Sequence, residues 1–135
     1  MSSYLDSNII IYTALYSGHK NEKAFALFER IGKGTDKAIT SVLAVDEFIW
    51  VVSKHRGRGI ALSLAKGIFR YPNLEILDVK SNDMLFAISL MEKYPHLKPR
   101  DAIHAAVAIN NNADKIYSDD SDFDALKEIG RVGLS

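Results

Sequence analysis

Short apolar runs alternate along the chain with longer segments in which apolar residues recur every three or four positions. The short runs predict buried strands, at Tyr4–Leu5, Lys37–Thr40, Leu74–Leu77, Lys115–Tyr117 and, at the end of the chain, Arg131–Leu134. Strands that are separated by helices in this way predict an α/β fold with a parallel sheet. We expect about four to five strands, flanked by helices on both faces because the strands are apolar throughout.

The longer segments predict helices, whose ends are marked by capping residues, glycines and a proline. Ser41 and Ser81 are expected to cap two of the helices, Pro99 to begin another, and Gly57 and Gly59 to break the chain. The helices are expected at Ser7–Tyr16, at Asn21–Ile31, from Ser41 to Ser53, after Gly59 to Phe69, from Ser81 to Tyr94, and at Pro99–Asn110.

Acidic residues directly follow two of the predicted strands. Asp6 comes after the first strand, and Asp119, Asp120 and Asp122 come after Lys115–Tyr117. In open parallel sheets, ligands bind beyond the carboxyl ends of the strands. We therefore expect two acidic sites that are far apart in the sequence to share one edge of the sheet.

Two of the candidate acids also have an ordinary structural explanation. Asp6 suits the N-cap of the first helix. Asp101 lies in the first turn after Pro99, where the helix dipole favours a carboxylate by about 0.3–1 kcal/mol. Position alone leaves a structural and a functional role open for both residues.

Glu47 and Asp46 are harder to explain by structure alone. The surrounding segment, residues 42–52, is apolar almost all round, which predicts a mostly buried helix. A buried carboxylate is rarely left without a partner or a metal. One of these two acids is therefore expected to be functional, although periodicity does not choose between them.

The segment Asp119–Asp124 contains four aspartates within six residues. Like charges this close repel each other, and a bound cation removes that repulsion. The alternative is a solvated, capped loop. An EF-hand is excluded, because the sixth position counted from Asp120 is Ala125 and the twelfth is Arg131, where that loop requires Gly and Glu.

Composition narrows the classes of protein. The 135 residues fit a single domain, 1–135, and the net charge is zero, so bulk charge does not favour nucleic acid. With no Cys, disulfides and thiolate sites are excluded. No apolar run reaches the roughly 20 residues that span a bilayer, and no basic signal-peptide start is present. We expect a soluble, cytoplasmic protein without membrane partners.

Basic side chains gather in one stretch. No acid occurs between Glu47 and Glu75, whereas five basic residues do: Lys54, Arg56, Arg58, Lys66 and Arg70. Such local charge suits a phosphate backbone, and a solvated helix face is the alternative. His104 lies three residues after Asp101 and is expected to be a packed core residue rather than a ligand.

Four segments together resemble motifs of the PIN domain family, especially its toxin branch, the ribonucleases of VapBC toxin–antitoxin pairs. They are Tyr4–Tyr12, with Asp6; Thr40–Ser41, placed six residues before Glu47; Lys98–Ala106, with Asp101; and Ser118–Asp124. The third segment is the most specific match. The spacing between Thr40–Ser41 and the acids that follow favours Glu47 over Asp46. In the family's fourth motif, the metal-site acid corresponds to Asp120, and Asp119 occupies a variable position.

The resemblance implies a three-layer PIN-like fold and an Mg²⁺- or Mn²⁺-dependent endoribonuclease that hydrolyses single-stranded RNA. The implied catalytic residues are Asp6, Glu47, Asp101, Asp120 and Asp122. Asp6, Asp101 and Asp120 would hold the metal, and Glu47 and Asp122 would bind a second metal or orient waters. Ser41 and Ser118 would support these acids. Candidate RNA contacts are Lys54, Arg56, Arg58 and Arg100. A small antitoxin and a homodimer are the implied partners.

Other functions remain open on the sequence. One is an RNA-processing or DNA-cutting PIN nuclease outside a toxin pair, and another is a non-catalytic module that binds RNA or protein. A phosphoacceptor receiver domain also has clustered acids on an α/β fold. It needs a Lys at the end of a later strand, however, and Lys115 begins its strand.

Overall fold

Five parallel strands form the centre of the computed structural model, which describes residues 2–15 and 17–134. In sheet order they are β3 (Leu74–Leu77), β2 (Lys37–Ser41), β1 (Ser2–Leu5), β4 (Lys115–Tyr117) and β5 (Gly130–Val132). Every neighbouring pair is parallel. The predicted parallel α/β sheet is therefore confirmed, and the first strand lies at its middle.

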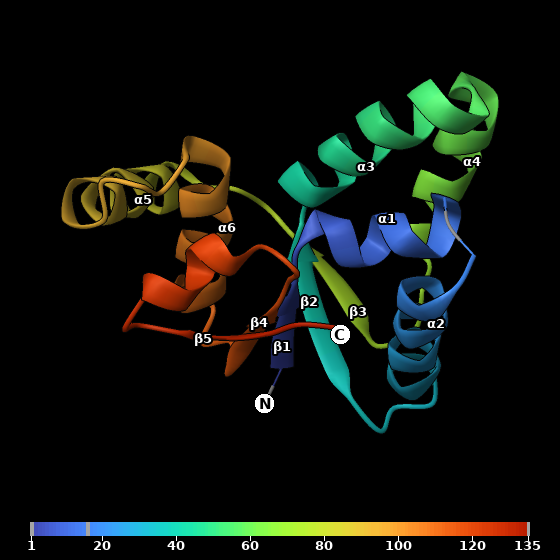
Figure 1. Ribbon diagram of the computed structural model, residues 1–135, viewed down its shortest axis with the longest axis horizontal. Coiled ribbons are helices and arrows are strands. Elements are labelled where there is room, and N and C mark those ends of the chain that lie inside the picture. The colour runs from blue at the N-terminus through green and yellow to red at the C-terminus, as the bar shows by residue number, and fades with distance from the viewer. Residues whose placement is uncertain (1, 16, 135) are drawn as a thin grey trace.

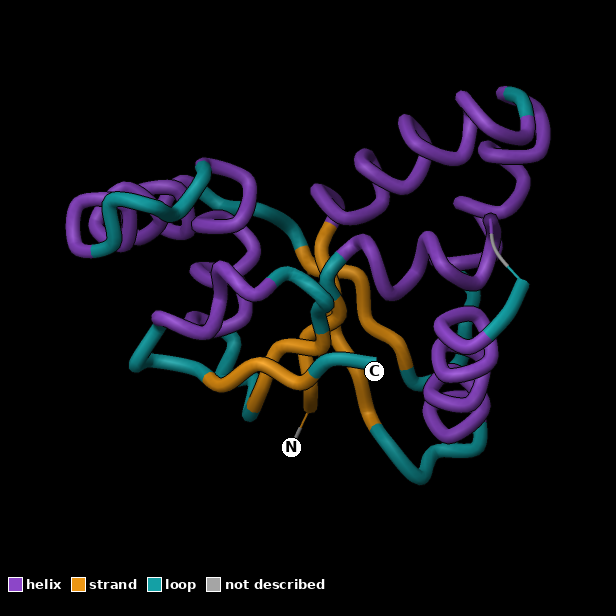
Figure 2. The backbone as a smooth tube through the Cα atoms, in the orientation of Figure 1, coloured by secondary structure: helices purple, strands orange, loops and turns teal. Residues whose placement is uncertain are grey.

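Helices cover both faces of this sheet, as expected for a three-layer fold (Figure 1). On one side lie α1 (Ser7–Leu15), α2 (His19–Gly32), α3 (Val42–Arg56) and α4 (Arg58–Phe69). On the other side lie α5 (Ser81–Lys93), α6 (Pro99–Asn110) and the short 3₁₀ helix η1 (Ser121–Ala125). Figure 2 shows the strands running between these two helical layers.

Two hydrophobic cores lie on opposite faces of the sheet, because successive side chains of a strand point to opposite faces. Leu5 and Ala38 pack into the core beneath α1–α4. Their neighbours Tyr4 and Ile39 pack into the core beneath α5 and α6. This alternation explains why the central strands are apolar at every position.

One predicted boundary on the α1–α4 side lies outside the described residues, and another is wrong. The predicted end of the first helix, Tyr16, lies outside the described residues, and α1 is described to Leu15. Gly59 does not break the chain but lies inside α4. Gly57 alone separates α3 from α4, and its φ of 90° is one that residues with a side chain rarely adopt.

Two further boundaries are corrected near the carboxyl-terminal half of the chain. Ser81 is the first residue of α5 and not its cap, because Lys80 precedes it in the extended conformation and donates its backbone N–H to Asp83 at 2.8 Å. The last strand covers Gly130–Val132 instead of Arg131–Leu134. Its register is set by β4, since Lys115 pairs with Gly130.

The expectation that α3 is mostly buried is wrong. Its buried residues are Ala44, Val45, Phe48 and Val52, whereas Val42 is 40% and Trp50 is 62% exposed. The helix has one core-facing side and one open side, despite an apolar composition on both. Among the described residues, no helix is both long enough and apolar enough to cross a membrane.

Candidate active site

The predicted acids meet at the carboxyl edge of the sheet, where β1 and β4 end and where α3 and α6 begin. The side chains form two groups. Within each group, the atoms that could bind a metal ion all lie within 4.8 Å of one another. The first group contains Asp6, Glu47 and His104, and the second contains Asp101, Asp120 and Asp122. All five acids proposed from the sequence are in these groups, although Asp6 lies with Glu47 and not with Asp101 and Asp120.

Asp6 is a buried carboxylate, with only 4% of the residue exposed. Its Oδ1 accepts a hydrogen bond from the backbone N–H of Ser7, the first residue of α1, at 2.7 Å. Its Oδ2 accepts from the Ser118 hydroxyl at 2.7 Å and from the Asn8 amide at 3.4 Å. These hydrogen bonds offset the free-energy cost of burying the Asp6 carboxylate and fix the orientation of both of its oxygens.

Ser118 connects the first acid with the acidic stretch. Its buried hydroxyl donates to Asp6 and accepts from the backbone N–H of Asp120 at 3.0 Å. Asp120 in turn accepts from the backbone N–H of Asp122 at 2.9 Å, where it caps η1. One hydroxyl therefore contacts the Asp6 carboxylate and the backbone of Asp120, two acids that follow different strands.

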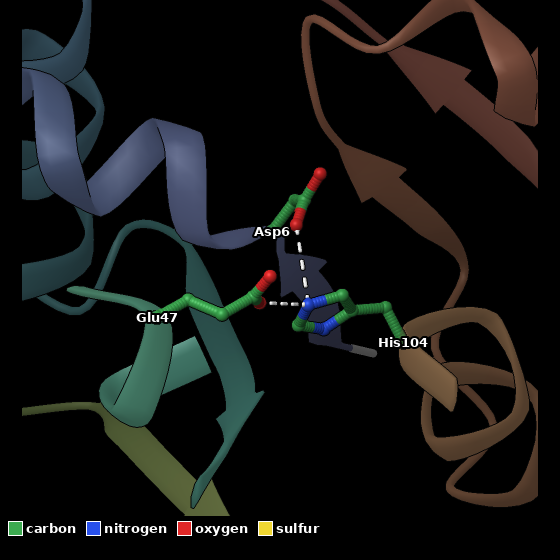
Figure 3. A group of neighbouring side chains, drawn as sticks. All are labelled: Asp6, Glu47 and His104. Carbon is green, nitrogen blue, oxygen red and sulfur yellow. Dashed lines mark hydrogen bonds and ion pairs between the residues drawn. The ribbon is translucent and has the colours of Figure 1, made fainter. Parts of the chain in front are cut away.

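His104 contacts two of these carboxylates, which the sequence did not reveal. The residue is buried, as predicted, but its Nε2 lies 2.5 Å from Glu47 Oε1 and 3.5 Å from Asp6 Oδ1 (Figure 3). Burial alone would lower the pKa of His104, but the hydrogen bond to Glu47 and the charge of Asp6 outweigh it and raise this pKa. The available signal was its position three residues after Asp101, on the same helix face.

Two hydroxyl groups form a hydrogen-bonded chain with the second ring nitrogen of His104. Nδ1 of His104 lies 2.6 Å from the Tyr4 hydroxyl, which lies 2.8 Å from Ser41 Oγ. Ser41 also accepts from the backbone N–H of Ala44 at 3.4 Å and so caps α3, as predicted. With a protonated imidazole, Nδ1 donates to Tyr4 and Tyr4 donates to Ser41, so that every member of the chain has a partner.

In the second group, the pKa of the Asp101 carboxyl group is raised. Burial, followed by the charges of Asp120 and Asp6, raises the pKa of Asp101 to about 7. Partial burial disfavours the ionised form, and the nearby like charges disfavour it further. A bound cation would remove this repulsion and would restore the ordinary acidity of the carboxyl group.

The chemistry of the second group fits Mg²⁺ or Mn²⁺. Both are hard cations that prefer oxygen ligands, and an octahedral Mg²⁺ places neighbouring ligands about 3 Å and opposite ligands about 4 Å apart. Asp101, Asp120 and Asp122 offer only carboxylate oxygens, all within 4.8 Å of one another. In the first group the imidazole already lies against Glu47, so its nitrogen is committed to the carboxylates.

The two neighbouring acids on α3 are clearly separated by the structure. The Glu47 side chain is 18% exposed and turns toward His104. Asp46 is exposed at the surface and is in neither group. This placement agrees with the motif spacing that favoured Glu47.

The remaining two acids of the Asp119–Asp124 stretch have other partners. Asp119 accepts from Lys20 at 2.9 Å, from the Tyr12 hydroxyl at 3.0 Å and from the backbone N–H of Leu134 at 2.9 Å. The exposed Asp124 is paired with Arg131 at 2.8 Å. Both carboxylates therefore connect parts of the chain around the site and are not members of either group.

The basic residues predicted to contact RNA lie at different distances from the carboxylates. Arg100 lines the same hollow as Glu47, and Lys54 lies over the Trp50 ring, 4.2 Å from its centroid. Arg56 donates to the carbonyl of Ala14 at 2.8 Å, at the far end of α3. Nine residues of helix place Arg56 about 14 Å from Glu47 along the axis. Arg58, exposed at the start of α4, follows it, so neither is brought to the carboxylates.

These features define a class of protein: a parallel α/β sheet with a carboxylate cluster at the carboxyl ends of its central strands. The model of the PIN domain family matches residues 3–129, which is nearly the whole chain. The chain belongs to the PIN domain family. Among curated proteins, none matches the sequence significantly.

Solved structures share the fold over almost the entire chain. VapBC2 of Rickettsia felis, bound to a promoter DNA fragment, has a TM-score of 0.75 at 20% identity and covers 98% of each chain. DNA-bound VapBC of Salmonella typhimurium has a TM-score of 0.74 at 20% identity, with coverage of 100% of this chain and 99% of its own. VapC20 of Mycobacterium tuberculosis, a sarcin-ricin loop cleaving toxin, has a TM-score of 0.75 at 16% identity, with coverage of 92% and 94%. At these identities the likeness establishes the fold.

Proposed function

We propose that this protein is a divalent-metal-dependent endoribonuclease that hydrolyses phosphodiester bonds in single-stranded RNA. The observation that supports this most is the cluster of Asp101, Asp120 and Asp122, whose oxygens lie within 4.8 Å of one another. The raised pKa of Asp101 agrees with it, because a cation would offset the burial and the charges of Asp120 and Asp6 that raise this pKa. Membership of the PIN domain family agrees with this chemistry.

In this proposal Asp101, Asp120 and Asp122 hold Mg²⁺ or Mn²⁺, and Asp6 contributes from its buried position beside them. A bound divalent ion stabilises the developing charge on the phosphate and lowers the pKa of a bound water. Glu47 lies at the opening of the site, where its free oxygen can orient a water. His104 holds Asp6 and Glu47 in place and neutralises part of their charge.

We further propose that the protein is the toxin of a toxin–antitoxin pair. Its structural relatives include VapBC complexes, one of which is described as a toxin–antitoxin complex from Klebsiella pneumoniae at 18% identity. The surface offers a place for such a partner: an apolar hollow of about 530 Å³ between α1, α2, α3 and α4. Its walls include Ile10, Phe25, Phe28, Phe48 and Ile68. The apolar side of an amphipathic helix fits a groove of this kind.

A homodimer is the second proposed assembly. The open side of α5 bears Met84, Leu85 and Ile88, which are 37%, 62% and 43% exposed. Contiguous exposed apolar side chains of this kind are typical of surfaces that meet another protein. Sedimentation of the purified protein would test this part of the proposal independently of its activity.

The central experiment is cleavage of a labelled single-stranded RNA by purified, antitoxin-free protein in Mg²⁺, Mn²⁺ or EDTA. We expect cleavage in either metal and none in EDTA. Asp6→Asn, Asp101→Asn and Asp120→Asn should each abolish cleavage, because each removes a charged ligand from the centre. A single-stranded DNA of the same sequence in parallel would decide between an RNA and a DNA substrate.

The acidic stretch itself provides a matched control. Asp124→Asn makes the same chemical change two residues from Asp122, but Asp124 is exposed and paired with Arg131. We expect this variant to cleave like the wild type and Asp122→Asn to be impaired. Metal-independent cleavage, or equal activity in all the variants, would contradict the proposal. Tight RNA binding without cleavage would favour a binding module.

A further inference from the structure

A second hollow of about 290 Å³ adjoins the carboxylate centre and has no role in the proposal above. It lies between α1, α3 and the start of α6. Its walls include Ser7 and Ile11 of α1, Asp46, Glu47 and Trp50 of α3, and Arg100 of α6. Glu47 belongs both to the walls of this hollow and to the first ligand group, so the hollow adjoins the site at Glu47.

Trp50 is the most conspicuous residue of this hollow. It is 62% exposed and lies on the open side of α3, in a row with Val42, Asp46 and Lys54 at four-residue spacing. The Lys54 ammonium lies over its ring, 4.2 Å from the centroid. A cation in this position attracts the ring and holds the indole in one orientation. Because Lys54 covers one face of the ring, the opposite face is the one on which a flat group could stack.

The charges around the hollow indicate what could occupy it. Asp46 and Glu47 are acidic, and Arg100 is the one basic side chain in its walls. Two carboxylates make the hollow itself unfavourable for a phosphate. Arg100 in its walls and Lys54 over the Trp50 ring could, however, each meet a phosphate beside the hollow. A flat, uncharged group between flanking phosphates fits this arrangement, and an unpaired nucleobase is such a group.

We propose that Trp50 is a stacking platform for an unpaired base of the nucleic acid strand that enters the carboxylate centre. This inference rests on the proposed function, since it assigns the nucleotide beside the cleaved phosphate. Trp50 and Glu47 lie within one turn of α3, about 5 Å along the helix axis. A base that stacks on Trp50 therefore belongs to the nucleotide next to the reacting one. Stacking on an aromatic ring tolerates every base, because every base has a flat face.

Trp50 is the only tryptophan in the chain, so its fluorescence reports this contact directly. The test uses the Asp101→Asn variant in Mg²⁺ to prevent cleavage, with a short single-stranded RNA and an otherwise identical RNA that contains abasic positions. We expect the RNA with bases to quench the fluorescence and the abasic RNA to do so much less. The two RNAs have the same phosphates, so the difference isolates the base.

Two substitutions complete the test. Trp50→Leu should weaken RNA binding by roughly 5- to 150-fold, and Trp50→Phe, which keeps a ring, by clearly less. Equal quenching by both RNAs, together with unchanged binding by Trp50→Leu, would overturn the inference. If Trp50→Leu instead dissociates a dimer, with no change in RNA binding, the surface serves a second copy of the chain and the inference is also overturned.

The cleavage assay keeps this outcome separate from that of the proposed function. A wild-type protein that cleaves in Mg²⁺ but shows no dependence on bases at Trp50 retains the nuclease function and loses the stacking site. A protein that binds bases at Trp50 but does not cleave supports the stacking site and contradicts the nuclease function.

Discussion

Replacing Asp101 with Asn should stabilise the metal-free protein at neutral and alkaline pH, although it removes a proposed ligand. The pKa of this carboxyl group rises from an ordinary 3.8 to about 7, first because it is partly buried and then because Asp120 and Asp6 lie close. Its ionised form is therefore less favourable in the folded chain than in the unfolded chain. The favourable contribution exists below about pH 4 and is lost as the pH rises through 7.

The magnitude follows from the same numbers. A rise of this size corresponds to about 4 kcal/mol for a fully shielded group. Asp101 is only partly buried, and solvent screening reduces the effect to roughly 1–2 kcal/mol. For a chain of this length, that difference shifts the melting temperature by roughly 3–8 °C. We therefore expect Asp101→Asn to melt higher than the wild type by this amount at about pH 8 in EDTA, and to melt similarly near pH 4.

Thermal unfolding followed by circular dichroism, in EDTA at several pH values, measures this difference. Mn²⁺ or Mg²⁺ should then raise the melting temperature of the wild type more than that of the variant, because the wild type keeps the charged ligand. Asp119→Asn is a control that should change stability in the opposite direction. Burial raises the pKa of Asp119, but its contacts with Leu134, Lys20 and Tyr12 outweigh burial and lower this pKa, so the substitution should destabilise the protein. An Asp101→Asn variant less stable than the wild type at pH 8 in EDTA would refute the reasoning.

Two other substitutions test the residues that orient the acids. Ser118→Ala removes the hydroxyl that donates to buried Asp6 and should lower the free energy of unfolding by about 1–3 kcal/mol, with weaker Mn²⁺ binding; urea unfolding and calorimetry measure these changes. A stability equal to that of the wild type would show that another donor replaces it. His104→Gln should destabilise the metal-free protein most at about pH 6 and less at higher pH, because the raised pKa of His104 gives a contribution that is lost as the imidazolium deprotonates. A deficit that does not change with pH, in urea unfolding, would contradict this.

Much of the fold follows from local patterns in the sequence. Short apolar runs that alternate with helices indicate buried parallel strands. Four of the five strands match their predicted positions closely. Pro99 begins α6 and Ser41 caps α3, as predicted, because the conformational preferences of these residues act over one turn. The errors at Gly59 and Ser81 arise where a residue that can end or cap a helix can also lie inside one.

The candidate site was partly predictable for a related reason. Acids that follow strands of a parallel sheet converge at one edge, so the approach of Asp6 to the Ser118–Asp122 segment follows from the order of strands and helices. The preference for Glu47 over Asp46 needed motif spacing, since both have apolar neighbours. The structure gives the physical difference: the Asp46 side is open and the Glu47 side faces the imidazole.

The tertiary structure alone decided the partners of each side chain. His104 looks like a core residue in the sequence, and nothing local predicts that its two nitrogens lie against Glu47 and Tyr4, 57 and 100 residues away. Likewise, the sequence cannot place Arg56 at the distant end of α3 or expose Trp50 beside the carboxylates. Sequence patterns determine which residues lie in strands and helices because those preferences are local. Which side chains meet depends on how the helices pack across the sheet, and only the folded chain determines that.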